Sequence, residues 1–251
     1  MKFNESNNPM FGEKTYAKVE TLERRRNGGG PFIEETSTMT VTGAVNKTFA
    51  LVGLMMLTFG FGFIMPNMLY AIVGSIAAFI IYMVTAFKPH LAPTLAPAYA
   101  LVQGLVVGTF SALFSYMYDG IIFQAFSLTI AILLSMLMIY KSGLIKVTSK
   151  FRMGVTMAVG SVMIMYVISA IGYFAGFEVP FLHEGGMIGI GLSLLIIGIA
   201  SLNLLLDFDN FDKGEEMQMP KYMEWYFGMG LLFTLIWLYL ELMTLIANLR
   251  E

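Results

Sequence analysis

The chain contains seven separate apolar stretches, each of about 20 residues, the length that an α-helix needs to cross the hydrocarbon core of a bilayer. Hydrophobic residues make up 57% of the 251 residues and charged residues only 13%. The charged share is about half of that usual in soluble domains. The pattern therefore predicts an all-α membrane protein. Its expected spans are 48–65, 68–87, 97–118, 121–140, 153–175, 187–206 and 228–249.

The first part of the chain has a different composition. Residues 1–40 are polar and contain three consecutive arginines, Arg24, Arg25 and Arg26. They lack the apolar core of a secretory signal peptide. We therefore predict a polar cytoplasmic N-terminal tail over 1–40 and a seven-transmembrane-helix domain over 41–251.

Positively charged residues fix the expected orientation. If the N terminus is inside, 14 of the 15 lysines and arginines fall in the tail and the inner loops, and only Arg250 falls outside. Cytoplasmic loops of membrane proteins carry an excess of lysine and arginine. Because the number of spans is odd, the C terminus is expected outside.

Several classes of function lack the residues that they need. The net charge is −2, and no basic stripe suggests nucleic acid as a partner. The chain has no cysteine, and His90 and His183 both lie outside the apolar stretches. Neither a zinc-protease HExxH motif nor a P-loop occurs, and span 228–249 has no lysine that could hold retinal. We predict that the protein is not an enzyme and has no resident cofactor.

Small residues four positions apart occur in several spans. The pairs are Gly74 with Ala78, Gly104 with Gly108, and Gly185 with Gly189. Such pairs let two membrane helices approach closely, so they predict helix packing.

Acidic residues of the last two spans are the candidate functional groups. Glu241 is the only charged residue inside any of the seven stretches, and an acid within the membrane is a functional candidate by default. Span six ends at Asp207, which shares a helical face with Asn203, four residues earlier. Asp209 follows roughly 200° round the helix and is expected to face elsewhere.

Two residues of the last segment are alternative partners for Asp207. Glu224 is level with Asp207 at the inner interface, whereas Glu241 lies roughly 20 Å further along the helix. Depth in the membrane favours Glu224 as the partner of Asp207, whereas burial favours Glu241. Phe208 and Phe211 would let span six extend inward, which would bring Asp207 below the membrane surface and closer to Glu241.

Two carboxyl groups that share one poorly hydrated site cannot both ionise cheaply. A pair of this kind would act as a proton-dependent latch, and in its ionised form it could attract a divalent cation, calcium, through oxygen ligands. Lys88, at the inner end of span two, is a candidate counter-charge for Asp207. The alternative for Lys88 is a lysine that only marks the membrane boundary.

The sequence resembles the Bax inhibitor family, the transmembrane Bax-inhibitor-motif proteins, and is most similar to a bacterial branch with a long polar tail. The resemblance implies a seven-helix bundle with a central seventh helix, a bacterial inner membrane, and a pH-sensitive calcium leak gated by one acid on each of the last two helices. The resembling segments are 6–9, 38–41, 92–93, 96–100, 150–152, 202–209, 220–226 and 237–241.

By this resemblance the two gating acids fall on Asp207 and Glu241. The chain departs from the family pattern in three respects. The second acid is glutamate rather than aspartate, the segment between the acids is longer, and Gln103 stands where a glutamate is expected. A basic residue on the second helix pairs with the first acid in other members, and Lys88 is the match here.

The resulting functional prediction is a pH-sensitive cation leak, with calcium as the cargo, the lipid bilayer as the environment, and Asp207 and Glu241 as the gating pair. The alternative is a regulatory protein that binds a membrane-bound protease, in which the polar tail would carry the function.

Overall fold

The computed structural model describes residues 38–176 and 186–250, and within them the chain forms seven long helices. Each is long and apolar enough to cross a membrane, which confirms the predicted all-α membrane class. The tail residues 1–37, and His183 and Gly185, lie outside the described residues. The helices are α2 (Val41–Ile64), α3 (Met68–Phe87), α4 (Ala92–Met117), α5 (Ile121–Ser142), α6 (Ser149–Ala175), α7 (Gly186–Glu216) and α8 (Met223–Asn248), with a short 3₁₀ helix, η2 (Pro89–Leu91), before α4.

Short turns separate several of these helices. Only three residues lie between α4 and α5, and the last of them, Gly120, has a φ of 71°. Glycine adopts this left-handed conformation without the steric cost that a side chain would bring. The turn after α2 ends with Asn67, whose side chain accepts a hydrogen bond from the Leu69 N–H (2.9 Å) and so caps α3.

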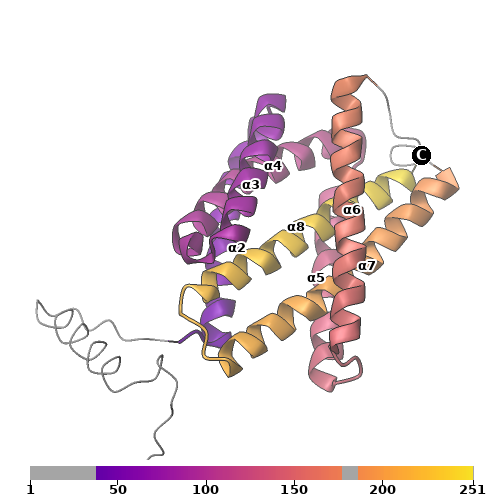
Figure 1. Cartoon of the computed structure of the whole chain (residues 1–251). Helices are drawn as coiled ribbons and strands as arrows, with labels where there is room; N and C mark the ends of the chain where they lie inside the picture. The colour runs from indigo at the N-terminus through magenta and orange to yellow at the C-terminus, as the bar shows by residue number, and fades with distance from the viewer. Residues whose placement is uncertain (1–37, 177–185, 251) are drawn as a thin grey trace, which may run out of the picture. The chain divides into compact units, whose positions relative to one another are not determined.

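The last helix, α8, is the centre of the bundle. It packs against α2, α4, α5 and α7, and it runs beside α7 in the middle of Figure 1. In its most apolar segment 72% of the residues are buried, whereas the share is 11% for α6. The implied central seventh helix is therefore confirmed.

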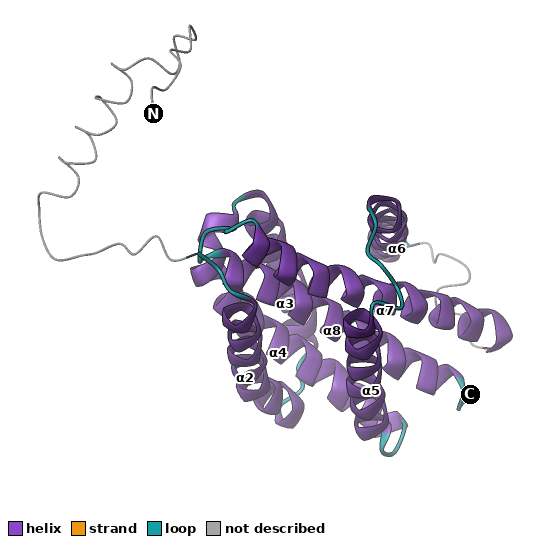
Figure 2. Cartoon of the chain, turned by 90° about the horizontal axis from the view of Figure 1, so that it is seen from below, coloured by secondary structure: helices purple, strands orange, loops and turns teal. Residues whose placement is uncertain are grey.

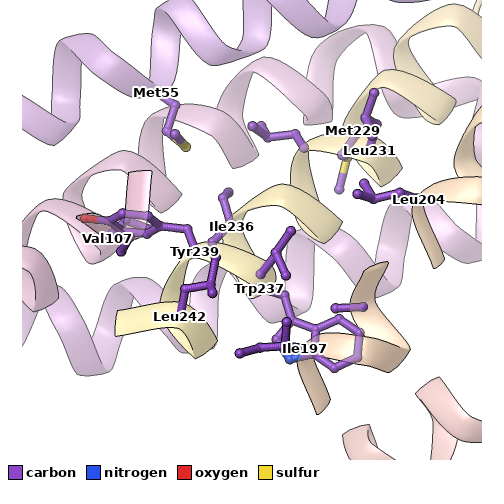
Figure 3. Packing of buried hydrophobic residues seen from close by; sticks show 14 of the residues in the cluster. Met55, Val107, Ile197, Leu204, Met229, Leu231, Ile236, Trp237, Tyr239 and Leu242 are labelled. Atoms are coloured by element: carbon purple, nitrogen blue, oxygen red, sulfur yellow. The ribbon is translucent and has the colours of Figure 1, made fainter. Parts of the chain in front are cut away.

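The hydrophobic core gathers around α8. Figure 3 shows Ile236, Tyr239 and Leu242 of α8 among side chains of α2, α4 and α7, including Met55, Val107 and Ile197. Burial of aliphatic and aromatic side chains from four helices at one place explains why α8 needs apolar residues on nearly all of its faces.

Helices α2 and α4 approach each other through glycines of α4. A Cβ on Gly104 would overlap Met55 O and Thr58 Oγ1, and a Cβ on Gly108 would overlap Phe59 O. Only glycine leaves room for the α2 backbone at these two positions, so the packing role predicted for this pair is confirmed.

Helix α7 extends ten residues beyond the predicted end of span six, to Glu216. Two aromatic residues explain the extension, because Phe208 and Phe211 are buried. Phe208 packs against Tyr140 of α5 and Phe211 against Phe227 of α8. As a result Asp207 lies inside the bundle rather than at the end of a helix.

Helix α6 lies at the periphery. It packs mainly on α7, and Figure 2 shows it standing apart from α2, α3 and α4. Its polar contacts to the bundle come from Arg152 near its start and from Tyr166 fourteen residues later. The two positions lie on nearly the same face of an α-helix.

Candidate functional site

Asp207 is buried in the bundle and is held by neutral hydrogen-bond donors. It is 8% exposed. The Thr234 hydroxyl of α8 donates to its Oδ2 atom at 2.7 Å, and the Asn203 amide donates to the same atom at 3.4 Å. Asn203 also donates to Thr234 Oγ1 (2.9 Å), so the three residues form one network, and the predicted common face of Asn203 and Asp207 is confirmed.

A cavity of about 130 Å³ opens beside Asp207 between α3, α7 and α8. Its polar lining comes from Tyr82 and Thr85 of α3, Asn210 of α7 and Tyr226 of α8. A hydroxyl, amide or carboxylate oxygen is the kind of ligand that hard cations prefer. In the described part of the chain, no cluster of three or more His, Cys, Asp or Glu residues is placed to hold a metal ion.

Glu241 lies in a second buried polar site. It is 8% exposed, and the Tyr166 hydroxyl of α6 donates to its Oε2 atom at 2.6 Å. The Ser193 side chain of α7 lies close to this carboxyl group and interacts with it. Trp237 Nε1, one turn earlier on α8, is buried next to Tyr166. This site connects α6, α7 and α8 through one carboxyl group.

The structure does not bring Asp207 and Glu241 together, which corrects the predicted shared carboxyl site. The Asp207 carboxylate is at the level of Thr234, whereas Glu241 lies seven residues further along α8, about 10 Å by helical rise. The two side chains have different partners, and in the described residues no hydrogen bond joins them. The chain thus has two buried acidic sites in place of one pair.

Asp209 faces away from Asp207, as the helical spacing predicts. It forms ion pairs with Arg152 of α6 and with Lys213 of α7, the latter at 2.7 Å. No ion pair joins Lys88, the candidate counter-charge for Asp207, to an acid of the described residues, which agrees with the alternative of a lysine that marks the membrane boundary. Lys88 is an exposed residue at the end of α3, and the ion pairs of α7 in the described part of the chain belong to Asp209.

Glu224 is not the solvated interfacial group that depth along the helix suggests. It is 3% exposed and accepts a hydrogen bond from the Thr40 N–H at 3.1 Å. Thr40 is the N-cap of α2, and its hydroxyl accepts from the Gly43 N–H (2.9 Å). In a capping box, a glutamate at the position of Gly43 bonds back to the N-cap N–H. Here Glu224 of α8 takes that place and joins the starts of α2 and α8.

Sequence reasoning missed the residues that hold the two acids from neighbouring helices. Thr234 and Tyr166 donate to the two acids, whereas Tyr82, Asn210 and Tyr226, also missed, only line the cavity beside Asp207. The position of Thr234 could have marked it as part of a polar face of α8, because it lies seven residues before Glu241 and so on the same side of the helix. The tyrosines carried no such signal, since an isolated tyrosine in an apolar span also occurs as a membrane-interface residue.

The described chain has seven apolar helices, and the one buried at the centre carries acids on its inner faces. These features define a multi-pass α-helical membrane protein. Comparison with protein families gives a match over residues 7–251 to the family described as Bax inhibitor 1 like. The chain belongs to this family. Neither the curated proteins nor the solved structures gave a match.

Proposed function

We propose that the protein is a proton-modulated cation leak of the membrane, with calcium as the cargo. The observation that carries the proposal is Asp207, a buried carboxylate that lines a polar cavity and is held by neutral donors. Asp207 forms no salt bridge with the lysines and arginines of the described residues. The charge of Arg152 acts on Asp207 from nearby, but no ion pair neutralises the carboxylate, so it can attract a mobile cation.

The chemistry of the cavity supports calcium as the cargo. Tyrosine and threonine hydroxyls, an asparagine amide and one carboxylate offer hard oxygen ligands. A single carboxylate gives a weak site, and conduction needs an ion that can both bind and leave. Protonation of Asp207 removes the only formal charge of the cavity lining, so the cavity attracts cations less strongly in acid.

Glu241 is the second control point in this proposal. Its carboxyl group ties α6 to α8 through Tyr166, and α6 is the least buried of the seven spans. Gain or loss of a proton at Glu241 changes which atom donates in this contact. A change at Glu241 therefore alters how firmly the peripheral helix is attached to the central one.

Calcium flux in liposomes tests the proposal. Purified full-length protein, reconstituted in vesicles loaded with a calcium indicator, should admit calcium faster at mildly alkaline than at mildly acidic pH. Asp207→Asn should lower the flux and remove part of its pH dependence. Glu224→Gln is the matched control, because an amide oxygen still accepts the Thr40 N–H. A wild-type flux equal to that of empty vesicles at every pH would refute the leak.

A second candidate function is the control of a membrane-bound protease through the polar tail. The structure offers one observation in its favour. The Met39 N–H donates to Met219 O (2.8 Å), and Thr38 pairs with Pro220, so the end of the tail is attached to the turn between α7 and α8. Deletion of residues 1–37 preserves these contacts and separates the candidates, because a leak should survive the deletion and tail-borne protease control should not.

The proposal assigns no catalytic step to the chain. It places the protein in a bacterial inner membrane, with the N terminus in the cytoplasm and the C terminus outside. The support for this orientation is the excess of lysine and arginine in the segments that would face the cytoplasm.

A further inference from the structure

A second cavity, of about 450 Å³, lies between the start of α6 and the end of α7. It is separate from the cavity at Asp207, and the two share no lining residue. Its lining residues are two cations, two hydroxyl-bearing residues and two methionines, namely Arg152, Lys213, Ser149, Thr156, Met153 and Met157.

The positive charge of this cavity exceeds the negative charge that faces it. Arg152 and Lys213 both pair with one carboxylate oxygen, Asp209 Oδ2. The next acid on α7, Asp212, accepts a hydrogen bond from Tyr140 of α5 (2.6 Å) and does not line the cavity. Two cations against one paired carboxylate leave a net positive charge at the cavity wall.

Arg152 and Lys213 also have hydrogen-bond donors that their ion pairs with Asp209 do not use. Of the guanidinium N–H groups of Arg152, one bonds to Asp209 and one to Asn210 (2.7 Å). Arginine has five N–H donors and the lysine ammonium has three. The side chains of Arg152 and Lys213 are 34% and 45% exposed, so their remaining donors can reach a ligand in the cavity. The hydroxyls of Ser149 and Thr156 add to these donors.

The two methionines indicate which kind of anion fits. Met153 and Met157 are exposed and lie four residues apart, on one face of a membrane-spanning helix. Both methionines line the cavity, and the helix that carries them is apolar enough to cross a membrane. A ligand with a phosphate group and an acyl chain would satisfy the cations with one end and cover the methionines with the other.

We propose that this cavity binds the phosphate of an anionic phospholipid. Arg152 and Lys213 hold the phosphate oxygens, Ser149 and Thr156 donate to them, and Met153 and Met157 pack against the first part of an acyl chain. The site is independent of the proposed leak, because it concerns lipid retention and uses residues outside the Asp207 cavity.

Native mass spectrometry of the full-length protein, delipidated in detergent, tests this site. The protein is titrated in separate arms with phosphatidylglycerol, with phosphatidylcholine and with inorganic phosphate. We expect tighter retention of phosphatidylglycerol than of the other two. Lys213→Gln should weaken phosphatidylglycerol binding about fivefold, the effect of one basic residue on the attraction to an anionic lipid.

One control variant and one further test variant complete the experiment. Lys88→Gln removes an exposed lysine at the end of α3, outside the cavity, and should leave retention unchanged. Thr156→Val removes a cavity hydroxyl, keeps both ion pairs of Asp209 and should weaken retention of phosphatidylglycerol. Equal retention of the two lipids by the wild-type protein would overturn the proposal. Equal effects of Lys213→Gln and Lys88→Gln, or binding of inorganic phosphate as tight as that of phosphatidylglycerol, would also overturn it.

Discussion

Substitution of Gly43 tests the junction between α2 and α8 most sharply. A Cβ at this position would overlap Glu224 Oε1, the atom that accepts the Thr40 N–H. Gly43→Ala should therefore displace the Glu224 carboxylate from the start of α2. In an unhindered helix the same substitution would stabilise the protein by up to about 1 kcal/mol.

The expected cost follows from the contacts that are lost. Loss of an N-terminal cap costs about 0.5–2 kcal/mol, and a buried acceptor left without its partner costs about 1–3 kcal/mol. We expect Gly43→Ala to lower the free energy of unfolding by about 2 kcal/mol, a value that combines these costs with the gain in helix propensity. In a Glu224→Ala background the overlap is gone, and Gly43→Ala should then be neutral or stabilising.

The assay is the free energy of unfolding of purified protein in mixed micelles of a mild detergent and dodecyl sulfate. The double-mutant cycle of Gly43→Ala and Glu224→Ala should give an interaction energy of about 2–3 kcal/mol. Gly53→Ala is the matched control, because it lies on the same helix with nothing within 4 Å of the added Cβ. If Gly43→Ala proves as harmless as Gly53→Ala, Glu224 does not cap α2.

Three further substitutions or fusions test other parts of the structure. Tyr166→Phe removes the donor to Glu241 and should speed amide hydrogen exchange in α6, whereas Tyr116→Phe, at an exposed position, should not. Thr234→Val leaves Asp207 without its shorter hydrogen bond and should lower the free energy of unfolding by about 1–3 kcal/mol. Thr244→Val, which removes only a bond to the backbone, should have a smaller effect. A topology reporter fused to the C terminus should read as external, and a cytoplasmic reading would reverse the proposed orientation.

Some features of the fold follow directly from the sequence because they depend on one helix at a time. The apolar stretches predict all seven helices, and the spacing of Asn203, Asp207 and Asp209 predicts which side chains share a face. The aromatic pair Phe208 and Phe211 also indicates the inward extension of α7 that the structure shows.

Contacts between helices do not follow in the same way, because they depend on the relative depth and crossing of two helices. The pairing of Asp209 with Arg152 and that of Glu241 with Tyr166 join residues that no spacing rule connects. Glu224 shows the difference most clearly. Its position near the start of α8 suggests an interfacial group in water, whereas the approach of Gly43 of α2 buries it.

The most direct test of the central claim is a comparison of calcium flux against pH for wild type, Asp207→Asn, Glu241→Gln and the double variant. The structure places the two acids in separate sites with separate partners. Each single substitution should therefore remove part of the pH dependence, and the double variant should remove the sum of both parts. A double variant that behaves like either single one would show that the two carboxyls titrate as one coupled pair and would contradict the account of two separate sites.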